Sequence, residues 1–328
     1  MYLPRHVRYF NLACFHVYQY AMMTLSSTEI INKKVDSYLT SMTNLAETIT
    51  SSSSKEGQEF PFVSVPRFEL LGSHIRSIVT NDVSIWAPLV TEDQREQWSN
   101  FSTTAIGWYN ESLSLHYDEP GALTDIYVDG DFRDKIWEGP DLNDTSNVAA
   151  TTPGPFAPLW QISPPTLSIS SVNYNLLHQK IIRDIFPALI EASDCVLGAA
   201  TIDSGGLPEA IFNSEHTLSD LTSHHPHTIQ LTPVSDKKDN KSSIVGFILS
   251  MIHWDDILVG AFPIGTNGIL VVIRDTCNQS ITYEVNNGEV RYVKCMGVAA
   301  SRRSFFLPLH YFTIYCTTGG VCDDGGST

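Results

Sequence analysis

The sequence predicts an α+β protein in which a long N-terminal helix precedes antiparallel sheets. Residues 24–50 carry a heptad stripe of apolar residues without glycine or proline, a pattern typical of a long amphipathic helix. The stretch Ser242–Val293 contains β-branched runs and the sequence Asn286-Asn287-Gly288, which predicts a two-residue hairpin turn. We expect about four or five strands in this stretch, with a short helix around residues 254–262.

The composition limits the class of protein. The chain has 328 residues, a length that fits two ordinary domains or one large one. Its formal net charge is −16, which argues against nucleic-acid binding because contact with phosphates requires a basic surface. The acidic residues are scattered and form no tail, so we interpret them as a solvated surface. No nucleic-acid partner is expected.

Cysteines and glycosylation sequons bear on the cellular compartment. None of the six cysteines lies in a CxxC motif, which argues against a zinc site. Five N-x-S/T sequons occur, more than the roughly three expected by chance, and this excess favours a secretory route. The sequons begin at Asn100, Asn110, Asn143, Asn240 and Asn278.

No segment has the length and composition of a strong transmembrane helix. The apolar run Phe305–Cys316 has about 12 residues, whereas a spanning helix needs about 20. Residues 1–25 contain Arg5 and Arg8 but match a signal peptide poorly, because polar residues interrupt the apolar segment. We therefore expect either a soluble chain or membrane segments that lie outside this sequence.

The helix over residues 24–50 has two interpretations. Its apolar residues recur at steps of four and three, which places them on one side of a helix. They are Ile31, Val35, Tyr38, Met42, Leu45 and Ile49. In the first interpretation this stripe packs on the protein's own domain. In the second it pairs with a second copy, forming a homodimeric stem that transmits displacements along its length.

Short helices and strands alternate through the middle of the chain. Thr91 and Gln94 fit a capping box that opens a helix running through Trp98 towards Tyr109. The polar loop over residues 235–243 is the expected internal boundary. The other expected elements are helices over 68–78 and 174–192 and strands over 83–90, 196–202 and 228–234.

The proline-rich span Gly154–Pro165 is the main candidate for ligand recognition. Its four prolines exclude a helix and predict a stiff, extended path. The span is then either a rigid crossover packed on a sheet or one wall of a small-molecule pocket. Aromatic walls with a few polar anchors suit such a pocket, although they also suit an ordinary core. The candidate ligand-binding residues are Trp108, Tyr127, Asp129, Trp160 and Gln161.

Enzyme signatures are missing from the sequence. It has no GxSxG elbow, no Walker A loop and no HExxH motif, so we expect no catalytic residue, no metal site and no cofactor. Asp255 and Asp256 superficially match the metal-binding aspartate of nucleotide cyclases. We interpret them as acidic residues in the first turn of a helix, and a metal-dependent enzyme fragment is the alternative.

Several segments together resemble a known family. In order and spacing they are similar to the extracellular sensor region of diatom and related algal receptor-type nucleotide cyclases (guanylate or adenylate), which is itself similar to CHASE sensor domains. The resemblance covers about residues 30 to 293. Its matching stretches are the long helix before Phe60-Pro61-Phe62-Val63, then residues 91–98, 158–164, 172–175, 265–272 and 275–277.

The resemblance implies two PAS-like lobes of the double-Cache or CHASE-like type. The expected division is a helical stalk segment over 1–58, a membrane-distal sensor lobe over 59–240, a membrane-proximal lobe over 241–293 and a divergent tail over 294–328. In such receptors transmembrane helices flank the sensor, and a class III cyclase domain follows inside the cell. The match stops at Val293, so we expect a truncated gene model that lacks the catalytic domain.

The expected function is therefore extracytoplasmic ligand sensing rather than catalysis. A small molecule would bind the first lobe between its sheet and the Trp160 segment, and a homodimer of stalk helices would carry the rearrangement inward. The expected location is membrane-associated on the extracellular or lumenal side, or secreted if the chain is truly truncated. A soluble secreted binding module with no signalling role is the second hypothesis.

Overall fold

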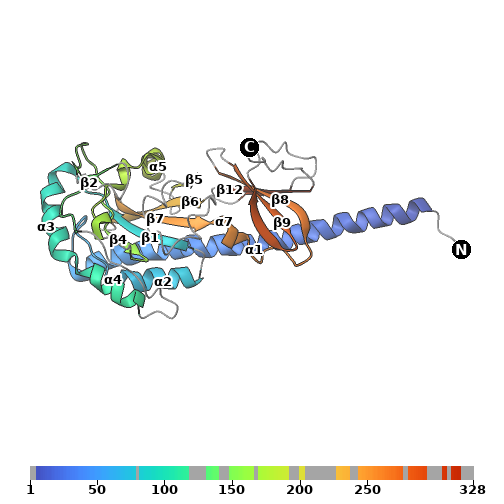
Figure 1. Ribbon diagram of the computed structural model, residues 1–328, viewed down its shortest axis with the longest axis horizontal. Helices are drawn as coiled ribbons and strands as arrows, with labels where there is room; N and C mark the ends of the chain where they lie inside the picture. Colours follow the sequence, from blue (N-terminus) through green and yellow to red (C-terminus); the bar gives the residue numbers. More distant parts are fainter. Residues whose placement is uncertain are drawn as a thin grey trace. The chain divides into compact units, whose positions relative to one another are not determined.

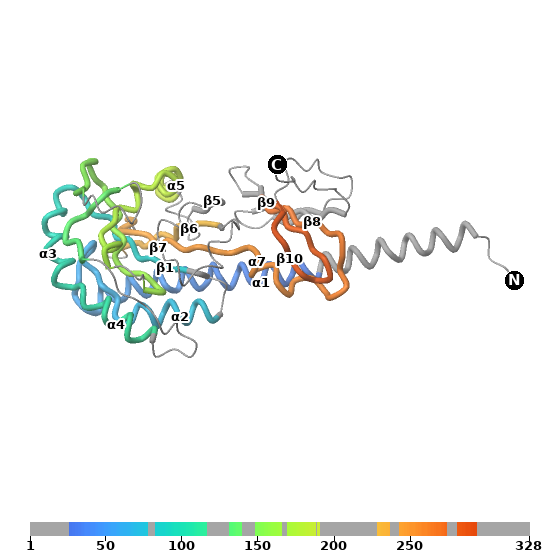
Figure 2. Tube along the Cα trace, viewed as in Figure 1, coloured from blue at the N-terminus to red at the C-terminus, as the bar shows by residue number. Residues whose placement is uncertain are grey.

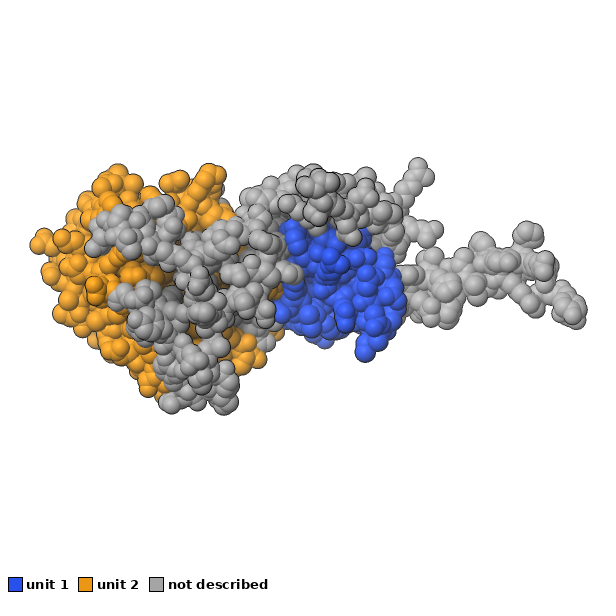
Figure 3. Space-filling view, in the orientation of Figure 1, with its two compact units in different colours: residues 1–36, 254–328 blue, residues 37–253 orange. Residues whose placement is uncertain are grey.

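A computed structural model describes residues 5–78, 81–117, 131–139, 148–165, 169–191, 199–203, 227–236, 243–275, 280–293, 305–308 and 312–318. The chain divides into two compact units (Figures 1 and 3). One contains Met1–Asp36 and Trp254–Thr328, and the other is Ser37–His253. For brevity, we call Ser37–His253 the large unit and the other the small unit. The fold is α+β, as predicted, with two five-stranded antiparallel sheets and a long N-terminal helix.

Helix α1 (Arg5–Glu56) has 52 residues and contributes to both units. Every residue of the predicted apolar stripe is at most 7% exposed. Between residues 26 and 56, every exposed residue of the helix is polar. The stripe therefore packs within the chain itself, as in the first interpretation. A second copy would have to bind through another surface. Among the helices that the structure describes, none is apolar enough over a sufficient length to cross a bilayer.

The large unit is built on a sheet with strand order β4-β1-β7-β6-β5, in which every neighbouring pair is antiparallel. The strands are β1 (Asn81–Pro88), β4 (Gln161–Ser163), β5 (Ala199–Asp203), β6 (His227–Asp236) and β7 (Ser243–His253). Strand β7 is the central strand of this sheet. Its residues 246–253 are all buried, as expected for a strand that is covered on both faces.

Helices cover both faces of this sheet (Figure 1). Tyr38 of α1 reaches Ser250, whereas Phe186 of α5 (Lys180–Glu191) packs on Phe247, with ring centroids 6.1 Å apart. Ser250 and Phe247 point to opposite faces of β7 because side chains alternate along a strand. The remaining helical elements are α2 (Phe68–Ile78), η1 (Glu92–Gln94), α3 (Arg95–Ala105), α4 (Gly107–Tyr117), η2 (Ile169–Ser171) and η3 (Leu176–His178).

The small unit has its own sheet, with strand order β10-β9-β8-β12-β11. Its elements are α7 (Trp254–Leu258), β8 (Asn267–Asp275), β9 (Ser280–Asn286), β10 (Glu289–Val293), β11 (Phe305–Pro308) and β12 (Phe312–Thr318). The predicted hairpin is confirmed between β9 and β10. Asn287 and Gly288 have φ values of 56° and 81°, as a type I′ turn requires.

Strand pairing in the structure does not follow the order of the sequence. Residues 242–293 do not form one sheet, because β7 pairs with β1 and β6 while β8–β10 belong to the small unit. The division between compact units falls at His253/Trp254, and the expected division into sensor lobes stays a prediction. The segment beyond Val293 is not separate from the fold, because β12 pairs with β8 along its whole length. Figure 2 follows β7 and β8–β10 along the backbone.

The capping box at Thr91 is confirmed, but the helix that it opens is shorter than predicted. The Thr91 amide donates to Gln94 Oε1 at 3.2 Å. A 3₁₀ turn leads into α3, which ends at Ala105, and α4 begins at Gly107 after a turn at Ile106. The single predicted helix is therefore two consecutive helices.

Candidate functional site

A buried carboxylate, Glu138, lies where three backbone segments of the large unit meet. Glu138 ends β2 (Trp137–Glu138), which pairs with β3 (Val148–Ala149). The Trp137 amide donates to Asn173 O at 3.1 Å, and the Asn175 amide donates back to Trp137 O at 2.9 Å. Leu176 N donates to Ala157 O at 2.9 Å, which joins the third segment. These bonds fix the position of the carboxylate from both sides.

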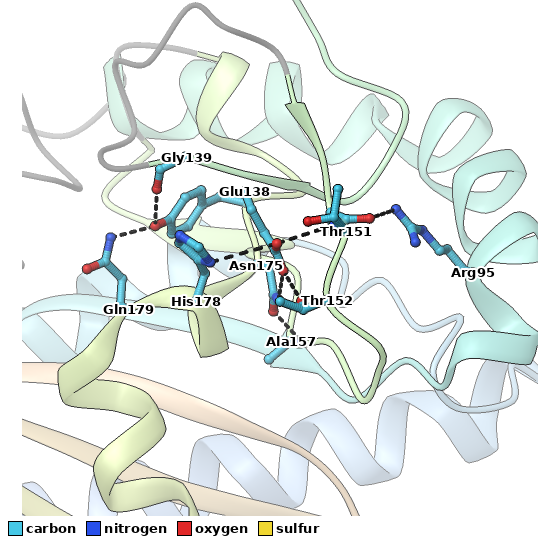
Figure 4. Close-up of polar contacts among 11 residues, drawn as sticks. Arg95, Glu138, Gly139, Thr151, Thr152, Ala157, Asn175, His178 and Gln179 are labelled. Atoms are coloured by element: carbon cyan, nitrogen blue, oxygen red, sulfur yellow. Dashed lines mark hydrogen bonds and ion pairs between the residues drawn. The ribbon is translucent and has the colours of Figure 1, made fainter.

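Three donors hold the Glu138 carboxylate (Figure 4). The Thr152 hydroxyl and Asn175 Nδ2 donate to Oε1, the latter at 2.9 Å. The Thr151 amide donates to Oε2 at 3.4 Å. His178 Nδ1 lies 3.8 Å from Oε2. Asn175 is itself oriented, because its Oδ1 accepts the Ala157 amide at 3.0 Å.

These contacts keep Glu138 ionised. Burial alone raises the pKa of Glu138, but the hydrogen bonds from Thr152, Asn175 and Thr151, with the nearby His178, outweigh it and lower the pKa below its ordinary value. The fold therefore holds a stable negative charge beneath the surface, with the partly exposed imidazole of His178 3.8 Å from it.

The backbone segments around the Glu138 carboxylate are also held by hydrogen bonds. The Tyr174 hydroxyl donates to Gly139 O at 3.2 Å and accepts a bond from Gln179 Nε2. On the other side, Arg95 Nη2 donates to Ala150 O, and its guanidinium lies 5.1 Å from the centroid of the Phe156 ring. The segment that carries Thr151 and Thr152 is thus tied to helix α3.

His178 is the part of this cluster that a ligand can reach. Its side chain is 36% exposed, whereas that of Glu138 is 6% exposed. Among the described residues, His178 Nε2 has no hydrogen-bond partner. An imidazole with one nitrogen near a carboxylate and the other accessible is suited to hydrogen bonding with a ligand. Within the described part of the chain, no three His, Cys, Asp or Glu side chains are grouped to hold a metal ion.

Two of the sequence-predicted ligand residues, Trp160 and Gln161, lie in the core. Trp160 is fully buried and packs 5.3 Å from Trp98 and 5.7 Å from Trp108, measured between ring centroids. The Gln161 side chain forms two hydrogen bonds with the Val65 backbone. It accepts from the amide at 2.8 Å and donates to the carbonyl at 3.0 Å. In this structure these residues form a rigid crossover packed on the sheet, the first of the two interpretations.

The other candidates are only partly placed. Trp108 is 5% exposed, and its Nε1 has no hydrogen-bond partner among the described residues. Tyr127 and Asp129 lie outside the described residues. The structure therefore brings Trp108 and Trp160 together but leaves a shared pocket with Tyr127 and Asp129 as a prediction.

Sequence reasoning did not identify the Glu138 cluster. The local signal is modest. Asn173-Tyr174-Asn175 places two side-chain amides beside an aromatic residue, and Trp137-Glu138 places a carboxylate beside one. Nothing in the sequence shows that these segments meet, because their pairing is non-local.

Asp255 and Asp256 lie in the first turn of α7, where they were predicted. Burial, followed by the neighbouring carboxylate of Asp255, raises the pKa of Tyr283 well above its ordinary value, so this phenol stays protonated. Asp255 is therefore next to a buried neutral phenol.

Comparison with known proteins finds no match for this sequence among family models or curated proteins.

Acidification is expected to remove the stabilisation that Glu138 provides. Its pKa is lower in the folded than in the unfolded chain, so the stabilisation is complete above the unfolded value of about 4.3 and is lost as pH falls through the folded value. At pH 7, Glu138→Gln should lower the free energy of unfolding by about 2 kcal/mol, because an amide replaces a charged acceptor.

Urea unfolding of both proteins at pH 7 and pH 3 measures this effect. The difference between wild type and Glu138→Gln should shrink towards zero at the lower pH. Glu96→Gln, on the exposed face of α3, is the matched control and should change little at either pH. A difference for Glu138→Gln that stays the same at both pH values would contradict the assignment.

Proposed function

We propose that this chain is the extracytoplasmic ligand-sensing region of a receptor-type nucleotide cyclase, with two PAS-like lobes, and that it does not itself catalyse a reaction. The proposal joins the family resemblance to one structural observation. Helix α1 is a single helix whose buried stripe supplies Ile31 and Val35 to the small unit and Tyr38 to Ile49 to the large unit. In the proposal, a displacement of this helix in one unit also moves its residues in the other.

The contact between α1 and the large sheet includes buried polar groups. The Tyr38 hydroxyl is hydrogen-bonded to Ser250 Oγ in the buried interface. Ser84 and Gln230 flank Ser250 in register on β1 and β6, and all three are at most 2% exposed. Thr50 Oγ1 also donates to Ser235 O at 3.1 Å. Directional bonds define particular positions of a helix on a sheet, which supports a switch between discrete arrangements.

One turn before Tyr38, the same helix holds an element of the small unit. Lys34 Nζ donates to Asp256 O at 3.0 Å and to Val259 O at 2.7 Å, at the C-terminal end of α7. A cation at this end of a helix is favoured by the orientation of its carbonyl groups. Lys34 and Tyr38 are separated by about 6 Å of helical rise. In the proposal, movement at Tyr38 is passed to Lys34 over this short length.

The ligand site in this proposal is the Glu138–His178 cluster. Aromatic side chains fill the space beside Trp160, where the sequence placed the pocket. His178 instead offers an accessible nitrogen beside a fixed negative charge. This arrangement favours a small polar molecule that exchanges a hydrogen bond with the imidazole.

A ligand screen followed by hydrogen exchange tests the proposal. The full chain is screened by thermal shift against amino acids, short-chain carboxylates and nucleobases, since a ligand at 100 times its Kd stabilises a protein by about 2.7 kcal/mol. A hit should depend on His178 and disappear in His178→Ala. It should also change amide exchange in residues 26–36 of α1, which belong to the small unit.

The possible outcomes separate the hypotheses. Exchange changes confined to residues 37–253 mean a binding module with no relay, as in the secreted alternative. Arg183→Ala, at an exposed position of α5, is the matched control variant and should retain binding. A hit that survives His178→Ala places the site elsewhere, and a screen without hits contradicts recognition of these chemical classes.

A further inference from the structure

Two of the sequons lie on described helices of the large unit. Asn100 is in α3 and Asn110 is in α4, and both side chains are exposed. Neither side-chain amide has a hydrogen-bond partner among the described residues. In contrast, the hydroxyl residues of the two sequons, Ser102 and Ser112, are 0% and 1% exposed.

The surfaces around both asparagines are polar and open. The exposed residues of α3 and α4 include no apolar side chain among those that the structure describes. They are Glu96, Gln97, Asn100, Thr103 and Thr104 on α3, and Gly107, Asn110, Glu111 and Ser114 on α4. A bulky hydrophilic group attached at either asparagine therefore displaces no packed side chain. The two helices lie on the outside of the large unit (Figure 1).

We infer that Asn100 and Asn110 are N-glycosylated, an inference that rests on the proposed extracytoplasmic location. The chemistry is transfer of an oligosaccharide from a lipid-linked diphosphate donor to an asparagine side-chain amide. A bond forms between Nδ2 and the anomeric carbon, while the bond from that carbon to the diphosphate oxygen breaks. The amide nitrogen loses one proton, and the lipid diphosphate leaves.

The burial of the two serines fixes the order of events. The sequon hydroxyl is part of the acceptor signal, and Ser102 donates to Ser99 O at 3.1 Å and to Asp134 O at 3.2 Å once the chain has folded. Modification at Asn100 must therefore precede folding, when Ser102 is still accessible. The finished glycans then keep the outer face of α3 and α4 in solvent, so this face is unsuited to a protein interface.

Cell-free translation of the full chain with endoplasmic-reticulum microsomes tests the inference. The chain is translated as it stands and also with a cleavable signal peptide added. Endoglycosidase-sensitive gel shifts are counted for wild type, Asn100→Gln, Asn110→Gln and the double variant. Each single variant should lose one shift and the double variant two. Asn44→Gln, at an exposed position of α1 outside any sequon, should lose none.

The two forms of the chain separate the possible failures. If the variants match wild type even when the signal peptide delivers the chain, the two sites are not used and the inference is overturned. If the shifts appear only with the added signal peptide, Asn100 and Asn110 are competent sites, and it is entry of the unaided chain into the secretory route that fails. Shifts with both forms support the sites and the location together.

Discussion

Replacement of Trp160 by alanine is expected to lower the free energy of unfolding by about 3–5 kcal/mol, the range for removing a buried aromatic side chain. Trp160 is fully buried. Its ring lies 5.3 Å from Trp98 and 5.4 Å from Phe101 between centroids, and its Nε1 donates to Ser64 Oγ at 3.0 Å. The truncation removes these contacts and leaves a cavity beneath α3.

Urea unfolding, monitored by far-UV circular dichroism, measures this loss. Wild type and variant are compared with the same m value, the slope of unfolding free energy against urea concentration. Trp160→Phe is the informative control because it keeps most of the aromatic packing and loses the Ser64 bond, and it should cost about half as much. A ligand-pocket residue held open to solvent would tolerate alanine with a loss under about 1 kcal/mol. That outcome would falsify the core assignment of Trp160.

The elements that sequence analysis predicted correctly are those whose causes are local. The stripe from Ile31 to Ile49 repeats at helical spacing, so burial of one side follows wherever the helix packs. Thr91 and Gln94 are three residues apart, and in the capping box the side chain of each is hydrogen-bonded to the backbone amide of the other. Asn287 and Gly288 adopt positive φ at low cost, which determines the hairpin before any other strand is known.

The errors arose where the partner of a segment is distant in sequence. Strand β7 is adjacent in sequence to α7 and β8, yet it pairs with β1, which is more than 150 residues earlier. An apolar run shows that a strand is buried but does not show which strands flank it. For this reason the sequence does not show that the division between compact units falls at His253/Trp254.

The candidate site was missed for a related reason. Sequence analysis weighed aromatic residues as pocket walls, but the aromatic residues near Trp160 fill the core. Glu138 and His178 are forty residues apart, and each alone resembles an ordinary surface residue. The backbone bonds between Trp137, Asn173 and Asn175, together with the side-chain bond from Asn175 to Glu138, bring them together, and no spacing rule predicts such an arrangement.

Asn173 is expected to be nearly as sensitive as Trp160, through its backbone and its side chain together. It is fully buried, with φ at 67°, a conformation that asparagine tolerates better than most residues. Its Oδ1 accepts from Trp98 Nε1 at 2.9 Å, and its Nδ2 donates to Ser102 Oγ at 3.1 Å and to Arg133 O at 2.7 Å. Asn173→Ala removes the buried acceptor of Trp98 Nε1 and the bonds to Ser102 and Arg133, and should cost about 3–4 kcal/mol.

A comparison of three variants separates the two contributions in the same urea experiment. Asn173→Gly loses the hydrogen bonds but relieves the positive φ, so it should be more stable than Asn173→Ala by about 1 kcal/mol. Asn173→Asp keeps an acceptor for Trp98 but places an oxygen against the Arg133 carbonyl, so it should also destabilise. If glycine and alanine cost the same, the backbone conformation contributes nothing. If both cost under about 1 kcal/mol, the buried network does not hold α3 to the segment that leads to Asn175 and the Glu138 carboxylate.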